Sequence, residues 1–83
     1  MEKTAIDAKV KSVMARIFGL SEDQIPDSAS QDSIEKWDSL GHLNLVVALE
    51  EEFGIMLSDE QVIELLNYKL VVQTVSELLA DRR

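Results

Sequence analysis

The chain has 83 residues, of which 46% are hydrophobic, and this length suits a single domain over residues 1–83 with one modest core. It contains no cysteine, which excludes disulfides, thiolate metal sites and a cysteine nucleophile. Its net charge is −8, and twelve of its sixteen acidic residues lie between residues 20 and 66 beside one base, so the surface repels nucleic acid and favours basic partner proteins.

No segment of the sequence indicates a membrane or a secretory signal. The longest uninterrupted apolar run, residues 45–49, is far shorter than the roughly 18 residues that a membrane-spanning helix requires. The residues after Met1 contain no apolar segment followed by a cleavage site. We therefore expect a soluble, cytoplasmic and monomeric protein without a membrane span.

The first predicted helix covers roughly residues 4–18. Thr4 and Asp7 resemble a capping box, and apolar residues follow at helical spacing until Gly19 ends the pattern. Residues 20–38 are polar and are predicted to form a loop, and loops of this length are usually functional or disordered. The apolar side chains that we expect to anchor this loop to the core are Leu20, Ile25, Ile34 and Trp37.

The second predicted helix begins after Asp38. The Asp38 carboxylate can accept hydrogen bonds from the free N–H groups of the first turn, and it suits the positive end of the helix dipole. Ser39 then opens the helix, which runs to about Phe53. Gly54 stands where a left-handed residue commonly ends a helix.

A short third helix and a final helix complete the chain. Ser58 and Gln61 form a capping box ahead of the third helix, and Thr74 and Glu77 form another ahead of the last, which ends near Asp81. No segment alternates with a period of two for long enough to indicate a strand. The sequence therefore predicts an all-α four-helix bundle of three longer helices and one short third helix, with a long loop between the first two.

The second helix is apolar on two sides. Leu45, Leu49 and Phe53 form one line at helical spacing, and we predict that this line faces the core. A second apolar line lies on a different side of the helix and comprises Leu40, Leu43 and Val47. We infer that this second face meets something other than the permanent core; the alternative is a helix buried on two sides.

Three consecutive glutamates, Glu50, Glu51 and Glu52, lie at the C-terminal end of the same helix. Carboxylates are mildly unfavourable there, because that end of the helix dipole is negative. We interpret them as contacts for a partner that carries lysine or arginine. The alternative is a solvated acidic face whose small cost is tolerated.

Asp38-Ser39-Leu40 stands at a predicted helix start and is followed by VVALEEEFGI over residues 46–55. In these two segments the sequence resembles the acyl carrier protein family of stand-alone type. The resemblance extends over essentially the whole chain, in the order of a first helix, a long loop, the Asp-Ser-Leu helix, a short third helix and a final helix. The triplet alone arises often by chance, but its place at a helix start and the acidic run after it make the pattern specific.

The resemblance implies that Ser39 receives a 4′-phosphopantetheine arm from coenzyme A through a separate Mg²⁺-dependent phosphopantetheinyl transferase. Asp38 and Leu40 flank this attachment site, and the thiol of the arm then holds an acyl or aminoacyl group as a thioester. The chain is thus expected to be a carrier and not an enzyme, with no catalytic residue and no metal site. In this family the second helix is the recognition element for enzymes with basic docking surfaces. The candidate partner contacts are Leu43, Asn44, Val47, Glu50 and Glu51.

The residues around the motif indicate which branch of the family the chain resembles. Many fatty-acid carriers have acidic residues directly after Asp-Ser-Leu, whereas this chain has glycine, His42, leucine and asparagine. Together with Trp37 before the motif, this is more like carriers of polysaccharide, aminoacyl or polyketide-type assembly. The aspartate at position 38 favours the acyl-carrying branch of the family, because peptidyl carriers often have histidine at that position.

The sequence is also compatible in part with three other functions. A hydrolase triad of Ser39, His42 and Asp38 is rejected because there is no Gly-x-Ser-x-Gly elbow and an adjacent Asp-Ser pair cannot orient a base; His42 is instead expected to be an exposed polar residue near the arm. A calcium site in the acidic loop is rejected because the EF-hand spacing of oxygen ligands is missing. An acidic interaction subunit with a carrier-like fold that is never loaded stays open as the alternative. The aromatic residues assigned to packing are Phe18, Trp37 and Tyr68.

Overall fold

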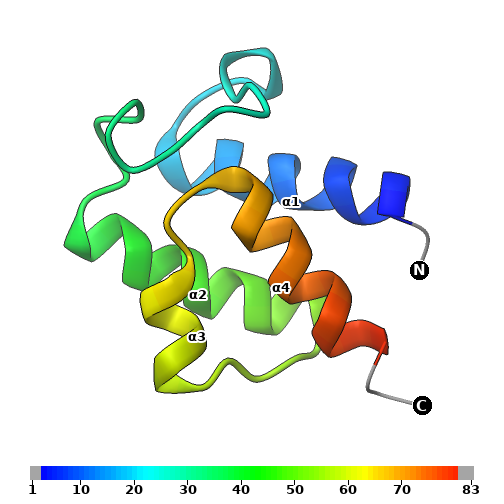
Figure 1. Ribbon diagram of the computed structural model, residues 1–83. Helices are drawn as coiled ribbons and strands as arrows, with labels where there is room; N and C mark the ends of the chain where they lie inside the picture. Colours follow the sequence, from blue (N-terminus) through cyan, green and yellow to red (C-terminus); the bar gives the residue numbers. More distant parts are fainter. Residues whose placement is uncertain (1–2, 81–83) are drawn as a thin grey trace.

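The computed structural model describes residues 3–80, which form a helical bundle (Figure 1). Its elements are α1 (Lys3–Phe18), the 3-10 helix η1 (Glu22–Gln24), α2 (Ser39–Phe53), α3 (Asp59–Glu64) and α4 (Tyr68–Ala80). Between residues 3 and 80 there is no strand, and an isolated antiparallel bridge joins Ser30 to Asn67. The predicted all-α bundle, with a short third helix and a long first loop, is confirmed.

The helices are arranged so that α2 begins at one end of the molecule. Figure 1 shows α1 starting and α4 finishing at the opposite end, with α3 beside the first half of α2. The loop between α1 and α2 passes over the end of the bundle at which α2 begins. The first turn of α2 is therefore bordered by the loop on one side and by α3 on another.

Both predicted glycine stops are confirmed. Gly19 has φ 68° and follows α1, and the N–H of Leu20 donates to Ala15 O at 2.9 Å. Gly54 has φ 64° and ψ 39° after α2, and its N–H donates to Glu50 O. Glycine adopts this left-handed conformation without the steric cost that other residues meet, so these two positions end their helices through local geometry.

The first helix lies where the sequence predicts it, to within one residue, but the predicted capping box at its start is wrong. α1 already includes Lys3, so Thr4 lies inside the helix, and the cap position before Lys3 lies outside the described residues. The Asp7 carboxylate does not close a capping box, because it accepts a hydrogen bond from the Tyr68 hydroxyl at 3.1 Å. The Asp7 side chain, which the local pattern predicts to cap α1, instead forms a tertiary contact with Tyr68 of α4.

The predicted start of the last helix is also wrong, because α4 begins at Tyr68 and not at Thr74. The N–H of Leu70 donates to Asn67 Oδ1 at 2.9 Å, so Asn67 is the residue that caps this helix. Thr74 lies in the helix interior, where its backbone N–H already has an intrahelical partner. The described part of α4 ends at Ala80, and the predicted end near Asp81 lies outside the described residues.

The long loop is packed against the core, as its apolar anchors predict. Trp37 is 2% exposed and stacks on Phe18 of α1 with their ring centroids 5.5 Å apart. The N–H of Tyr68 donates to Ala29 O at 2.9 Å, which ties the middle of the loop to the start of α4. The loop residues buried in the core are Ile25, Ala29, Ile34 and Trp37, and Leu20 is half-buried against it.

Candidate functional site

The first turn of α2 has the geometry that its sequence predicts. Asp38 is extended, and its Oδ1 accepts from the N–H of Gly41 at 2.8 Å. The Asp38 carbonyl accepts from the N–H of His42 at 2.7 Å, which is the first intrahelical bond. Ser39, the first residue of α2, is exposed, and its hydroxyl has no hydrogen-bond partner among the described residues.

Gly41 allows this turn to approach the loop closely. A β-carbon at this position would lie on the carbonyl oxygen of Lys36, at a separation far below van der Waals contact. The backbone of Lys36 and the start of α2 therefore pack directly against each other. This close approach fixes the direction in which the Asp38-Ser39 pair projects from the bundle.

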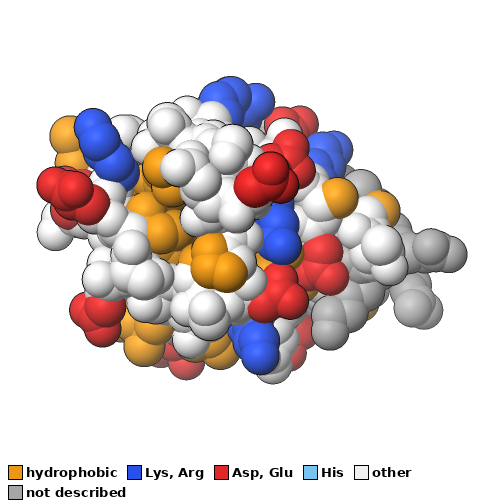
Figure 2. Space-filling model, turned by 90° about the horizontal axis from the view of Figure 1, so that it is seen from above, with side chains coloured by type: hydrophobic (Ala, Val, Ile, Leu, Met, Phe, Trp, Pro, Cys, Tyr) orange, Lys and Arg blue, Asp and Glu red, His pale blue; other side chains and the backbone are white. Residues whose placement is uncertain are grey.

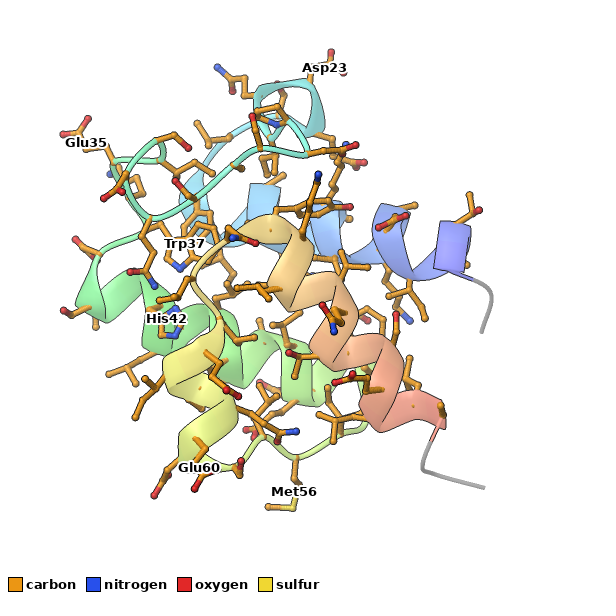
Figure 3. All side chains as sticks on the ribbon, viewed as in Figure 1. Asp23, Glu35, Trp37, His42, Met56 and Glu60 are labelled. Atoms are coloured by element: carbon orange, nitrogen blue, oxygen red, sulfur yellow. The ribbon has the colours of Figure 1, made fainter. Side chains whose placement is uncertain are left out.

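His42 is half-buried beneath the loop, so the expectation that it is an exposed polar residue is wrong. Trp37 Nε1 donates to His42 Nδ1 at 2.9 Å, and His42 Nε2 lies 2.8 Å from Val62 O in α3. Figure 3 shows Trp37 and His42 lying next to each other between the loop and α3. The tryptophan indole, which has only a donor, finds its acceptor in the imidazole ring.

The two apolar lines of α2 differ in burial: one is buried in the core and the other is exposed to solvent. Leu45, Leu49 and Phe53 are buried, which confirms the predicted core face. Leu40, Leu43 and Val47 are 69%, 58% and 54% exposed, respectively. The alternative of a helix buried on two sides is therefore wrong, and α2 presents an apolar face to solvent. Exposed apolar side chains also lie in and after α3, at Ile63 and Leu66.

Two of the three glutamates at the end of α2 have partners within the chain. Glu50 is half-buried, and its Oε2 accepts from the N–H of Leu57 at 2.9 Å. Glu52 pairs with two bases of α1: its Oε2 lies 3.8 Å from Lys9 Nζ, and its Oε1 lies 3.7 Å from a guanidinium nitrogen of Arg16. These two glutamates therefore have contacts within the chain, and the interpretation of the run as partner contacts stays a prediction. Glu51 is exposed, and within residues 3–80 its side chain forms no hydrogen bond or ion pair.

The opposite surface carries charges of both signs. Figure 2 looks onto α1 and the loop, where lysine and arginine side chains are interspersed with acidic ones. Lys11 Nζ and Asp27 Oδ1 are 3.2 Å apart on the boundary between these two elements. Lys11 thus offsets an acidic residue of the loop, whereas Arg16 lies beside α2, where it lines a shallow hollow together with Asn44, Val47 and Glu51.

Ser39, His42 and Asp38 do not form a catalytic triad. Both ring nitrogens of His42 are engaged by Trp37 and Val62, and the Asp38 carboxylate accepts from the N–H of Gly41. Between residues 3 and 80, no three histidine, cysteine, aspartate or glutamate side chains come together as a metal-ligand group. The helices in the same range include none that is long and apolar enough to cross a membrane.

A family model described as a phosphopantetheine attachment site matches residues 8–79. The chain belongs to this family. It is a carrier protein, and its cofactor is covalently attached 4′-phosphopantetheine. Carrier domains of this kind interact with a phosphopantetheinyl transferase and with biosynthetic enzymes, and they are typically non-catalytic. The resemblance to acyl carrier proteins is therefore confirmed.

The start of α2 fits this group. Covalent attachment of a phosphodiester needs a hydroxyl that solvent and a second protein can reach, and Ser39 is exposed at the first position of the helix. The N–H groups of Ser39 and Leu40 belong to the first turn and have no described partner, so they are free to donate to phosphate oxygens. The exposed apolar face of α2 starts at the same turn.

Proposed function

We propose that Ser39 is the residue that carries the 4′-phosphopantetheine arm. The observation that carries this proposal is an exposed serine hydroxyl, without a hydrogen-bond partner among the described residues, at the first position of a long helix. The positive end of the helix dipole and the free N–H groups favour a phosphodiester at this position. In this proposal Asp38 shapes the turn by capping it, and Leu40 flanks the arm.

Other serines of the chain are less suited to attachment. The Ser58 hydroxyl accepts from the N–H of Gln61, and the Ser33 hydroxyl bonds to both backbone groups of Ser30. The Ser76 hydroxyl is buried. Ser28 is exposed but lies in the loop, away from any helix start, so it provides a matched control for a reactive surface serine.

The carrier function follows from the arm and from the surface around it. When bound, the arm supplies a terminal thiol that holds an acyl or aminoacyl group as a thioester, chemistry that a chain without cysteine cannot supply itself. The chain contributes the attachment hydroxyl and the surface that partners recognise. We therefore propose that it delivers cargo to partner enzymes in the cytoplasm and catalyses no reaction itself.

We propose the exposed face of α2 as the surface that these partners recognise. Leu43 and Val47 provide exposed apolar area, and Asn44 and Glu51 provide polar groups on the same helix. A partner with an apolar patch bordered by lysine or arginine complements this face. Glu50 is proposed as a contact as well, in addition to accepting the bond from the N–H of Leu57 in the turn after α2.

The pathway proposed is fatty-acid, polyketide, polysaccharide-modifying or related biosynthesis. The absence of acidic residues directly after the Asp38-Ser39-Leu40 motif favours a specialised pathway over general fatty-acid synthesis. The alternative function is an acidic helical interaction subunit that is never loaded. Loading of Ser39 distinguishes these two functions.

The experiment is intact-mass spectrometry after incubation with coenzyme A, Mg²⁺ and a broad-specificity phosphopantetheinyl transferase. We expect the wild type and Ser28→Ala to gain one phosphopantetheine, and Ser39→Ala to gain none while it keeps its helical circular dichroism. No gain on the wild type with several transferases would favour the unloaded subunit. Loading of Ser39→Ala would show that another residue is the attachment site.

A further inference from the structure

The short helix α3 is held by the packing of Val62 against the core and by contacts at its two ends. None of its six residues is buried, and a helix this short is not stable alone in water. Its first turn is closed by a capping box in which Gln61 N donates to Ser58 Oγ and Ser58 N donates to Gln61 Oε1. Leu65, directly after the helix, is fully buried. The contacts at the C-terminal end of α3 therefore add to the packing of Val62 and Leu65 in fixing the position of this helix.

That C-terminal end receives hydrogen-bond donors from two other elements. His42 Nε2 of α2 lies 2.8 Å from Val62 O, and Gln31 Nε2 of the loop donates to Leu65 O at 3.3 Å. The backbone N–H of Gln31 also donates to Leu66 O at 3.5 Å. Val62 O also accepts from the N–H of Leu65 at 3.4 Å, so the bond from His42 adds a second donor to this carbonyl, while Gln31 serves the two carbonyls that follow the helix. Of these contacts, the one from His42 is the shortest.

The contacts of His42 select one tautomer of its ring. Trp37 Nε1 can only donate, so His42 Nδ1, 2.9 Å away, accepts and carries no proton. Nε2 then carries the proton and donates to Val62 O. The Gln31 amide nitrogen, 3.5 Å from Nδ1, offers a second donor to the same acceptor. The neutral imidazole thus joins the loop, α2 and α3.

We propose that His42 is a positioning residue for loading: through Nε2 it holds the C-terminal end of α3 against the first turn of α2. This inference rests on the proposed function of Ser39. His42 lies three residues after Ser39, and its contact with Val62 O brings the C-terminal end of α3 beside the same part of α2. The proposal takes this end of α3 as part of the surface that the transferase contacts. When α3 leaves this position, only a fraction of the molecules presents the complete surface, and the apparent affinity for the transferase falls by that fraction.

Two conservative variants separate the two bonds of the imidazole. His42→Asn retains an acceptor near the position of Nδ1 for Trp37 but cannot reach Val62 O. His42→Gln retains a donor near the position of Nε2 for Val62 O but loses the acceptor for Trp37. Asp23→Asn in η1, exposed at the far side of the loop, is the control for a substitution outside this network (Figure 3).

Three readouts are measured on each variant: kcat/KM for loading by the transferase, amide hydrogen exchange of α3, and the indole N–H resonance of the only tryptophan. A lost hydrogen bond shifts the equilibrium that holds α3 in place about fivefold, so for His42→Asn we expect kcat/KM to fall by up to about fivefold. The amides of Val62 and Leu65 should exchange faster, while that of Val71 in α4 is unchanged. For His42→Gln we expect loading and α3 exchange near wild type, with a shifted indole resonance.

The proposal is overturned if His42→Asn loads as fast as the wild type with unchanged α3 exchange, or if both variants lose loading equally. It is also overturned if ¹⁵N spectra of the wild type place the ring proton on Nδ1. Failure of the proposed function would look different. In that case the wild type is not loaded at all, and the α3 exchange of the two variants still decides whether His42 positions this helix.

Discussion

Tyr68 joins the first and last helices through its hydroxyl, which donates to both the carbonyl oxygen and the carboxylate of Asp7 at 3.1 Å. Burial, and then the negative charge of Asp7, raises the pKa of Tyr68 well above its ordinary value of 10.0. The folded protein therefore keeps this phenol protonated at a pH at which the unfolded chain ionises it. The resulting contribution to stability is fully present below pH 10.0 and is lost as the pH rises above it toward the folded pKa.

We predict that the free energy of unfolding falls as pH rises above about 10, and that Tyr68→Phe makes this fall shallower. At neutral pH the variant should unfold about 1 kcal/mol more easily, because the bond to Asp7 is lost. Urea denaturation from pH 8 to about 11 measures both effects, and tyrosinate absorbance reports this group alone because the chain has one tyrosine. An identical pH dependence in both proteins would contradict the assigned environment.

Gly41 is needed for the close approach of α2 to Lys36 O. We predict that Gly41→Ala lowers the free energy of unfolding by about 1–3 kcal/mol, because the loop backbone must move to admit a β-carbon. The alanine would otherwise favour the helix, so the sign of the change is diagnostic. Urea denaturation that shows a more stable Gly41→Ala protein would mean that the contact is absent in solution.

The role of His42 shows why some of the site could not be predicted from the sequence. A histidine in the first turn of a helix is equally compatible with solvent exposure and with a buried contact. The burial of His42 depends on tertiary structure. The loop brings the Trp37 indole to Nδ1, and the C-terminal end of α3 brings Val62 O to Nε2. By contrast, the Asp38 cap and the exposed Ser39 follow from positions adjacent in sequence, and they could be predicted.

At the scale of the elements, a capping motif predicts a helix end correctly where the nearby sequence offers no second motif for the same end. The Ser58/Gln61 box and the glycine ends of α1 and α2 were predicted and are found. For α4 two signals compete, since Thr74 with Glu77 matches the box template while Asn67 stands before an apolar run. The helix starts after Asn67, because the ring of Tyr68 is buried and its hydroxyl bonds to Asp7, 61 residues away.

This correction to α4 can be tested with two matched alanine variants. We predict that Asn67→Ala destabilises the protein by about 1 kcal/mol, because the N–H of Leu70 loses its side-chain acceptor. Thr74→Ala should be neutral or slightly stabilising, because Thr74 lies inside the helix and alanine has the higher helix propensity. Thermal or urea unfolding gives both values, and the reverse order would restore the helix start at Thr74.

At the scale of the whole molecule, the excess negative charge and the apolar face of α2 act together. The net charge is −8, and Glu51 is the glutamate of the acidic run without a described partner. Electrostatic attraction of this kind chiefly raises the association rate, and salt screens it over about 10 Å at 0.1 M ionic strength. Loading by a transferase with a basic docking surface should therefore depend on salt and on the position of the charge.

We predict that Glu51→Gln lowers kcat/KM for loading about two- to fivefold at low salt and that added salt removes most of the difference. Asp23→Asn changes the net charge by the same amount on the opposite side of the loop, so it is the matched control and should load like the wild type. Steady-state loading rates at several salt concentrations measure the effect. Equal losses in both variants would assign it to net charge instead of to the face of α2.

Peptide mapping of the loaded protein tests the central assignment most directly. Trypsin cleavage after Lys36 and Lys69 releases residues 37–69, a peptide that holds two serines, Ser39 and Ser58. We predict that fragmentation locates the phosphopantetheine on Ser39, whose hydroxyl is free, and not on Ser58, whose hydroxyl serves the capping box. A modification on Ser58, or on a peptide outside residues 37–69, would contradict the account of the start of α2 as the attachment site.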